Sequence, residues 1–282
     1  MNEEKLRIVQ MVGEGKITAE EAEKLLSAME ASDPAARENT QPAPDREVPP
    51  HSEAGSSTTS GETDEDAQSR SFPAAGIRRV RVSFKSGDIT VRGADTGEIT
   101  AVFDGSAPTC EVSGDTLEIK SGGNAFGFFG MGNLRSCNAT ITLPRDMKIE
   151  LKSANGDISA EDINADTAVS AVNGDISLRK VSGRLKLSTV NGDLDGEVDS
   201  SDARITTVNG DISLRWQNAP QSGRVGASSV SGDIDLAFPA ATQASVKMNS
   251  VRGDRHSDFP GSGGPFTVQI NSVSGDLSVR KI

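Results

Sequence analysis

A short phrase, Asn/Ser-Gly-Asp followed by Ile or Leu, recurs through the second half of this 282-residue chain. The glycines of successive copies are 18, 18, 18, 22, 21 and 22 residues apart, with a variant copy at the sixth. These glycines are Gly156, Gly174, Gly192, Gly210, Gly232, Gly253 and Gly275. A period of about 20 residues is typical of stacked repeats, in which each coil buries apolar side chains against its neighbours. The repeat therefore predicts a solenoid.

Alignment on the glycine places the same kind of side chain at each position of the repeat. Valine stands two residues before the glycine in most copies, Ile or Leu two residues after it, and an aliphatic residue five before it. Such positions stack about 4.8 Å apart in a parallel β-solenoid and fill one core. Asn-Gly also favours an antiparallel hairpin turn. The whole-repeat period favours the parallel β-solenoid, with coils of 18–22 residues.

Residues 1–30 predict a small α-helical hairpin. Its second helix begins with a capping box of Thr18 and Glu21 and then shows one apolar face. Helices of about a dozen residues are marginal alone in water, so this face should pack on the other helix, a second copy or a partner protein. The candidate partner-binding residues here are Leu6, Val9, Leu25, Leu26 and Met29.

Residues 31–72 predict a disordered linker, because they are rich in proline, serine and acids and poor in apolar residues. Of the net charge of −12, residues 1–30 contribute −3 and residues 31–72 contribute −6, which leaves −3 for residues 73–282. No cluster of Lys and Arg suited to phosphates stands out, so nucleic acid is not an expected partner.

Residues 73–282 predict the β-solenoid domain, with an irregular capping part to residue 150 and regular repeats over 151–282. We expect some antiparallel pairs in the irregular part. The last repeat strand, near Leu277, is expected at an open edge, where Arg280 and Lys281 discourage further pairing.

A glycine-rich segment, 122–132, holds Phe126, Phe128 and Phe129, and its glycines do not have a nucleotide-binding spacing. These Phe side chains either fold over the end of the solenoid or form an apolar patch for a protein or a peripheral membrane contact.

The aspartates after the repeat glycines would form a column if the coils stack. They include Asp157, Asp175, Asp193, Asp211 and Asp233. Carboxylates about 4.8 Å apart repel by roughly 1 kcal/mol even in water, so solvent, turn hydrogen bonds or a cation must offset the repulsion. Turn capping is the favoured interpretation. A calcium column is the alternative, although calcium-binding β-roll repeats are shorter and richer in glycine.

No catalytic constellation is recognisable, since the two histidines, His51 and His256, stand apart from any nucleophile pattern. Cys110 and Cys137 lack metal-ligand spacing, which leaves both a disulfide and free thiols open. No cofactor or metal is expected. The chain shows neither a secretory signal nor an apolar run long enough for a transmembrane helix, so a cytoplasmic location is expected, with non-classical export to the cell surface as the alternative.

Two parts of the chain resemble one bacterial family. The segment from Lys5 to Leu26, with Gly13-Glu14-Gly15-Lys16-Ile17-Thr18 at its centre, resembles the N-terminal hairpin of YvlB-like and LiaX-like proteins. The repeats around Asn173-Gly174-Asp175-Ile176 are similar to their C-terminal "putative adhesin" domain of unknown function. The resemblance implies a right-handed parallel β-helix and a link to envelope stress responses, with no catalytic residues.

We therefore expect a non-enzymatic binding or scaffold protein. Its hairpin would serve partner or self-association, and its solenoid would offer an extended β surface. A surface-exposed adhesin and a carbohydrate-active β-helix enzyme are the alternatives.

Overall fold

The computed structural model describes residues 68–121 and 136–282. The predicted hairpin at 1–30, most of the predicted linker, and the loop with Phe126, Phe128 and Phe129 lie outside the described residues.

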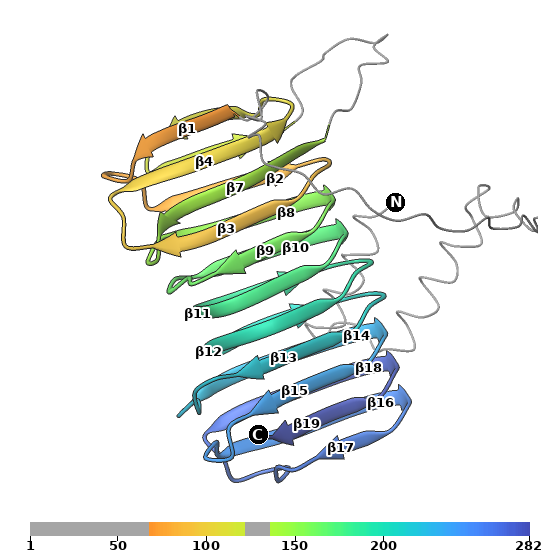
Figure 1. The fold of residues 1–282 in the computed structure, drawn as a ribbon. Helices are drawn as coiled ribbons and strands as arrows, with labels where there is room; N and C mark the ends of the chain where they lie inside the picture. Colours follow the sequence, from red (N-terminus) through yellow and green to blue (C-terminus); the bar gives the residue numbers. More distant parts are fainter. Residues whose placement is uncertain (1–67, 122–135) are drawn as a thin grey trace, which may run out of the picture.

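The described strands form two facing layers that are joined at the corners of the coils (Figure 1). In spatial order, layer A contains β5 (Thr109–Ser113), β6 (Thr116–Lys120), β2 (Arg79–Phe84), β8 (Lys148–Asn155), β10 (Thr167–Asn173), the second halves of β11 (Ile176–Ser188) and β12 (Leu194–Thr206), β14 (Gly223–Ser231), β18 (Phe266–Ser274) and β16 (Ala244–Arg252). Layer B contains β1 (Gln68–Pro73), β4 (Glu98–Gly105), β7 (Cys137–Pro144), β3 (Ile89–Ala94), β9 (Ile158–Glu161), the first halves of β11 and β12, β13 (Ile212–Trp216), β15 (Ile234–Phe238), β19 (Leu277–Lys281) and β17 (Arg255–Ser257).

Successive coils pair in parallel, one repeat apart. Val169 on β10 lies opposite Leu187 on β11, and Leu187 lies opposite Ile205 on β12. The predicted parallel stacking is therefore confirmed, and the hairpin interpretation of Asn-Gly is wrong for these repeats. The irregular part contains the expected antiparallel pairs, β1–β4, β4–β7 and β5–β6, which lie at the first end of the solenoid.

The repeat glycine lies where consecutive coils approach most closely. Gly192 has a φ of +148°, and a Cβ added to it would lie 2.2 Å from the carbonyl oxygen of Gly174. Its N–H donates a hydrogen bond to the carbonyl oxygen of Asn209 on the next coil, at 3.1 Å. The glycine therefore provides both a left-handed corner and room for the neighbouring backbone.

The main core follows the predicted repeat positions in part. The aliphatic residues two after and five before the glycine, such as Ile176 and Leu187, are buried in it in every copy except that of Gly253, where Arg255 is exposed and Met248 is partly buried. The valines two residues before the glycine do not join this core, contrary to the prediction. They form a separate small cluster at the corner, made of Val172, Val190, Val208 and Val230. The small polar residue preceding each valine points inward instead, because side chains alternate between the two sides of a strand.

The order of coils differs from the order of the sequence at both ends. The β2–β3 coil lies inside the β6–β7 coil, and the final β18–β19 coil lies between the β14–β15 and β16–β17 coils. The expectation that the last strand forms the open edge is therefore wrong. β19 pairs on both sides, and β16 and β17 form the edge of the second end (Figure 1).

The boundary of the linker also needs correction. β1 begins at Gln68, inside the range predicted to be linker, and pairs with β4. Phe72 packs against the core, and the Ser71 hydroxyl donates a hydrogen bond to Glu98 at 3.0 Å. The short alternating segment Arg70-Ser71-Phe72 forms a strand although it is poor in apolar residues, because β4 provides backbone hydrogen-bond partners for it.

Aromatic side chains fill the core at the second end. Trp216 stacks on Phe238 with ring centroids 4.3 Å apart, and Phe259 and Phe266 meet Phe238 edge to face. The Trp216 indole N–H donates a hydrogen bond to the carbonyl oxygen of Ser200 at 2.7 Å, so its burial leaves no unpaired donor. The described residues contain no helix that could span a membrane.

Candidate binding site

The predicted aspartate column exists, and its members are joined by hydrogen bonds. Except at Asp88, whose N–H donates to Asn138 Oδ1, the backbone N–H of each aspartate donates to Oδ1 of the aspartate on the neighbouring coil, at 2.7–2.9 Å. The column contains Asp88, Asp157, Asp175, Asp193, Asp211, Asp233, Asp276 and Asp254. A parallel ladder of asparagine side chains runs beside it through Asn155, Asn173, Asn191 and Asn209, with Nδ2 to Oδ1 distances of 2.9 Å.

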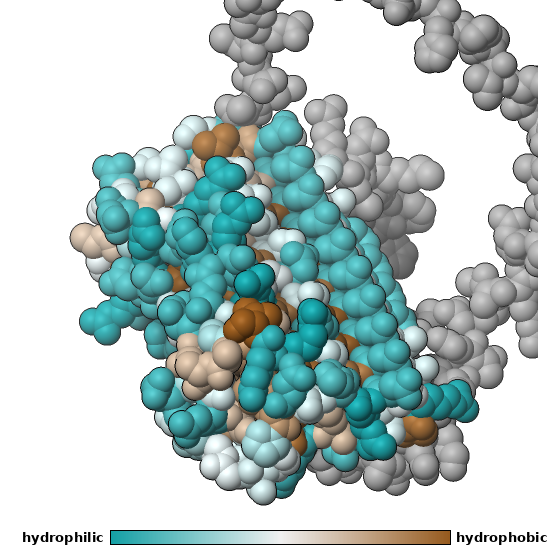
Figure 2. All heavy atoms as spheres, turned by 60° about the horizontal axis from the view of Figure 1, so that its bottom comes forward, coloured by the Kyte–Doolittle hydropathy of each residue, from teal (hydrophilic) through white to brown (hydrophobic). Residues whose placement is uncertain are grey.

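These columns explain the repeated phrase structurally. Each carboxylate accepts a backbone N–H that the corner would otherwise leave unpaired. Figure 2 shows hydrophilic side chains stacked in an unbroken column along the molecule. Within residues 68–121 and 136–282, no three His, Cys, Asp or Glu side chains gather closely enough to hold a metal ion. The hydrogen bonds between the aspartates give these carboxylates a capping role at the corners.

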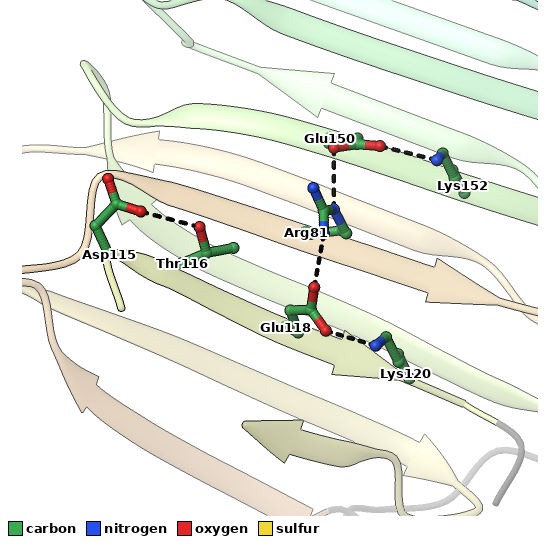
Figure 3. Close-up of polar contacts among 7 residues, drawn as sticks. All are labelled: Arg81, Asp115, Thr116, Glu118, Lys120, Glu150 and Lys152. Atoms are coloured by element: carbon green, nitrogen blue, oxygen red, sulfur yellow. Dashed lines mark hydrogen bonds and ion pairs between the residues drawn. The ribbon is translucent and has the colours of Figure 1, made fainter. Parts of the chain in front are cut away.

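The outer face of layer A carries a connected charge network at its first end (Figure 3). Arg81 Nη1 donates to Glu118 at 2.6 Å, and Arg81 Nε donates to Glu150 at 3.0 Å. Lys120 pairs with Glu118, and Lys152 pairs with Glu150 at 2.8 Å. Hydrogen bonds from Lys120 and Arg81 hold the pKa of Glu118 below its usual range, and those from Lys152 and Arg81 do the same for the pKa of Glu150. Every charged group in this network has an oppositely charged partner, although its three cations outnumber its two carboxylates by one.

The middle of the same face is different. Arg184, Lys186, Arg204 and Arg224 make no ion pair with any other residue in the described part of the chain. We call these four residues the cationic patch. Lys186 and Arg204 are register partners on β11 and β12, so two like charges lie side by side. Asp166 is already paired with Lys148 at 3.2 Å.

Two hollows border this patch, each where a small residue occupies an outward position. The first lies over Ala168 and is bounded by Lys148, Asp166, Arg184 and Lys186. The second, the Gly226 hollow, has a volume of about 200 Å³. Its lining consists of Asp202, Ala203, Arg204, Ile205, Thr206, Arg224, Gly226, Ser228, Gln269 and Asn271. Asp202 is the one carboxylate among these lining residues, against two arginines.

The remaining candidates from the sequence do not form a catalytic centre in the described residues. His256 Nε2 lies 3.1 Å from Asp258 Oδ1 on an exposed turn. Cys110 and Cys137 are free thiols, which answers the open question of their pairing. Burial, followed by the nearby Asp104 and Cys110, raises the pKa of Cys137 to about 11. A thiol with that pKa is protonated at neutral pH and is a poor nucleophile.

The cationic patch itself was not predicted from the sequence. Its residues come from three successive coils, and their proximity is evident only when the register of β11, β12 and β14 is known. One local signal was present: Gly226 interrupts an alternating strand pattern, which often indicates a close approach or an open position.

Comparison with known protein families gives two matches along the chain. The Toastrack DUF4097 model matches residues 58–281, and a SHOCT-like domain model matches residues 3–33. No curated protein matches the chain.

Among solved structures, a "putative adhesin" from Bacteroides fragilis is 16% identical, and the alignment covers 78% of this chain and 98% of that one with a TM-score of 0.50. A "putative adhesin" and a "putative lipid binding protein" from Parabacteroides distasonis are each 11% identical, with the same coverages of 78% and 98% and TM-scores of 0.40 and 0.35. Because the Toastrack model spans most of its length, the chain belongs to the Toastrack DUF4097 family.

Proposed function

We propose that this chain is a non-enzymatic binding protein of the adhesin type, which holds its ligand on the outer face of layer A. The observation that carries the proposal is the cationic patch of Arg184, Lys186, Arg204 and Arg224, which makes no ion pair among the described residues. At the other end of the same face, every charged group of the Arg81 network has an oppositely charged partner. The description of the Bacteroides fragilis neighbour as a "putative adhesin" agrees with a binding role.

Arg184 lies near Asp166, whose pKa it helps to lower after Lys148, but the Lys186–Arg204 pair gives no evident attraction in the folded chain. Lys186 and Arg204 repel each other by roughly 1 kcal/mol, and no carboxylate of the described residues pairs with either. An anionic group from outside would remove this repulsion and supply the missing hydrogen-bond acceptors. A rigid solenoid suits this role, since it holds the four side chains at spacings fixed by backbone pairing.

Binding through the patch is tested with charge-neutral variants. Full-length protein is applied to immobilised acidic glycans, neutral glycans and extracellular-matrix proteins at low and high salt. Saturable, salt-sensitive binding that the double variant Lys186→Gln/Arg204→Gln weakens supports the proposal. The matched control is Arg179→Gln/Arg215→Gln, which removes two exposed charges from layer B and should bind normally. Absence of saturable binding to every surface would overturn the proposal.

Two cellular settings compete within this proposal. An adhesin acts at the cell surface, whereas the resemblance to YvlB-like and LiaX-like proteins favours a cytoplasmic scaffold in an envelope stress response. The right-handed coil that the resemblance also implies is compatible with either setting. Cell fractionation separates them: protein found only outside the cell supports the adhesin setting, and protein found only in the cytosol supports the scaffold.

The N-terminal segment adds a second candidate role. The SHOCT-like match over residues 3–33 agrees with a separate association element, for which Leu6, Val9, Leu25, Leu26 and Met29 are the candidate contacts. We propose that it binds a partner or a second copy. Sedimentation and pull-down of full-length protein against a variant lacking residues 1–30 test this role. An unchanged mass and partner set would contradict it.

A further inference from the structure

We propose that the Gly226 hollow binds an acidic sugar, that is, a monosaccharide unit carrying one carboxylate or phosphate. The inference rests on the proposed binding function and names the ligand class and the position of that function. It is built from the shape of the hollow, from its unpaired arginines and from the polar groups around them.

The shape of the hollow follows from one missing side chain. Gly226 occupies an outward position on β14, in register with Arg204 on β12 and Gln269 on β18. A Cβ added to Gly226 would meet no atom within 4 Å, so the space above it is open. A volume of about 200 Å³ is smaller than the ~300–1,000 Å³ of drug-sized pockets. The hollow therefore accepts one small group rather than a ligand of several rings.

The two arginines of the hollow lack acceptors. Arg204 Nη2 is buried and has no hydrogen-bond partner in the described residues, which is unusual for a buried donor. Arg224 lies on the next coil, opposite Asp202, and forms no ion pair there within the described residues. A planar guanidinium binds a carboxylate or phosphate through parallel N–H···O bonds. Arg204 is half-buried and Arg224 is exposed, and both line the hollow, so an anionic group there would pair with the N–H groups that these side chains leave open.

The other polar side chains of the Gly226 hollow can form hydrogen bonds with the hydroxyl groups of a sugar. Thr206 and Ser228 contribute hydroxyls, and Gln269 and Asn271 contribute amides. Asn271 Oδ1 already accepts a hydrogen bond from Asn249, at 3.0 Å, which directs its Nδ2 donors elsewhere. Asp202 adds a carboxylate that accepts from a sugar hydroxyl. None of the described lining residues is aromatic, so a neutral sugar would gain no stacking energy there. The hollow would therefore distinguish sugars mainly by the attraction between the two arginines and a negative charge on the ligand.

The surroundings argue against a densely charged polymer. The whole chain carries a net charge of −12, and the carboxylates of Asp166, Glu150 and Glu118 follow on the same face. Duplex DNA carries a charge every ~1.7 Å and needs a long basic track. Two arginines in one hollow instead match a ligand with isolated charges.

The test uses full-length protein and amide NMR titrations with glucuronic acid, glucose 6-phosphate, glucose, inorganic phosphate and a 12-nucleotide thymidylate strand. We expect both acidic sugars to saturate and to shift the amide signals of Gly226 and Ser228, and glucose to shift neither. Arg204→Gln/Arg224→Gln should weaken binding at least about tenfold, as should Gly226→Val, which fills the hollow and keeps both arginines. The control Arg179→Gln/Arg215→Gln should bind as the parent does, and thermal unfolding checks that all variants fold.

Each contrary result would overturn a different element of the proposal: the ligand class or the position of the site. Equal binding of glucose, or inorganic phosphate binding as tightly as glucose 6-phosphate, would refute recognition of a sugar. Tighter binding of the thymidylate strand would assign the patch to nucleic acid. Saturable binding unaffected by Gly226→Val and by loss of both arginines would place the site elsewhere, with the proposed binding function intact. If the glycan surfaces bind the protein but the monosaccharides shift no signal, the hollow is not the site.

Discussion

The carboxylate of Asp193 accepts a hydrogen bond from the backbone N–H of Asp211, at 2.8 Å. Asp193 donates its own N–H to Asp175 on the preceding coil, also at 2.8 Å. Each aspartate thus ties two coils together at the same corner. The asparagine ladder beside it repeats this arrangement with side chains alone.

The acceptor, rather than the charge, should matter at this corner. Asp193→Asn keeps an oxygen for the Asp211 N–H and removes one charge from a like-charged column, so its stability should equal or exceed that of the parent. Asp193→Ala leaves that N–H without its acceptor and should cost about 1 kcal/mol. Urea unfolding of both variants measures the difference. A larger loss for the asparagine variant than for the alanine variant would mean that the charge is required.

The Arg81 network predicts a pH dependence (Figure 3). Lys120, Lys152 and Arg81 lower the pKa of Glu118 and Glu150 in the folded state. Their contribution to stability is therefore complete above the ordinary Glu pKa of about 4.3 and is lost as the pH falls through the lowered folded values. Arg81→Met should reduce this contribution. Its urea-unfolding free energy should decline less steeply than that of the parent below about pH 4.3, and parallel declines would contradict the network's role.

Thr207→Val should stabilise the protein. Thr207 is fully buried, and its Oγ1 has no hydrogen-bond partner in the described residues. Valine keeps the branched shape and removes a desolvated hydroxyl, for a gain of about 1 kcal/mol and a rise in Tm of roughly 2–4 °C. Scanning calorimetry checks this value. Thr206→Val is the comparison, because the Thr206 hydroxyl donates to the Leu187 carbonyl, at 3.5 Å, and should show a smaller gain.

The Cys137 thiol should be protected in the native protein. Its pKa of about 11 and its complete burial leave very little accessible thiolate at pH 7. Native protein should therefore react with a thiol reagent at Cys137 at least about a hundredfold more slowly than denatured protein, as followed by peptide mass spectrometry. Rapid native labelling of Cys137 in a Cys110→Ser variant would show that the region around β7 opens easily.

Much of the fold could be predicted because the repeat places equivalent residues at equal spacing. The register of Leu187 with Val169 and Ile205 follows from an 18-residue period and a two-residue side-chain alternation. The corner glycines were also predictable, since an Asn-Gly pair supplies a positive φ. The valines were misassigned because the strand turns the corner there, and the alternation that holds within a strand does not tell which side faces the core.

The candidate site was much harder to predict. Arg204 and Arg224 are diagonal neighbours on adjacent strands, because Arg204 pairs with Gly226 and Arg224 pairs with Asp202. A sequence pattern gives no measure of which surface charges are compensated; Arg81 and Arg204 look alike until their neighbours are known. The order of the coils at the two ends was also not predictable. A coil can add to the outer edge of the stack or lie between two earlier coils, and the repeat sequence is the same in both cases.

The inserted position of the final coil has a consequence for how the solenoid is completed during synthesis. The β16–β17 coil pairs only with β18 and β19, which are made after it. Until β18 and β19 have been translated, that coil has no pairing partner among the described strands, and the β14–β15 edge stays open. The β18–β19 strand pair therefore joins the two sides of the stack, although it is translated after both of them.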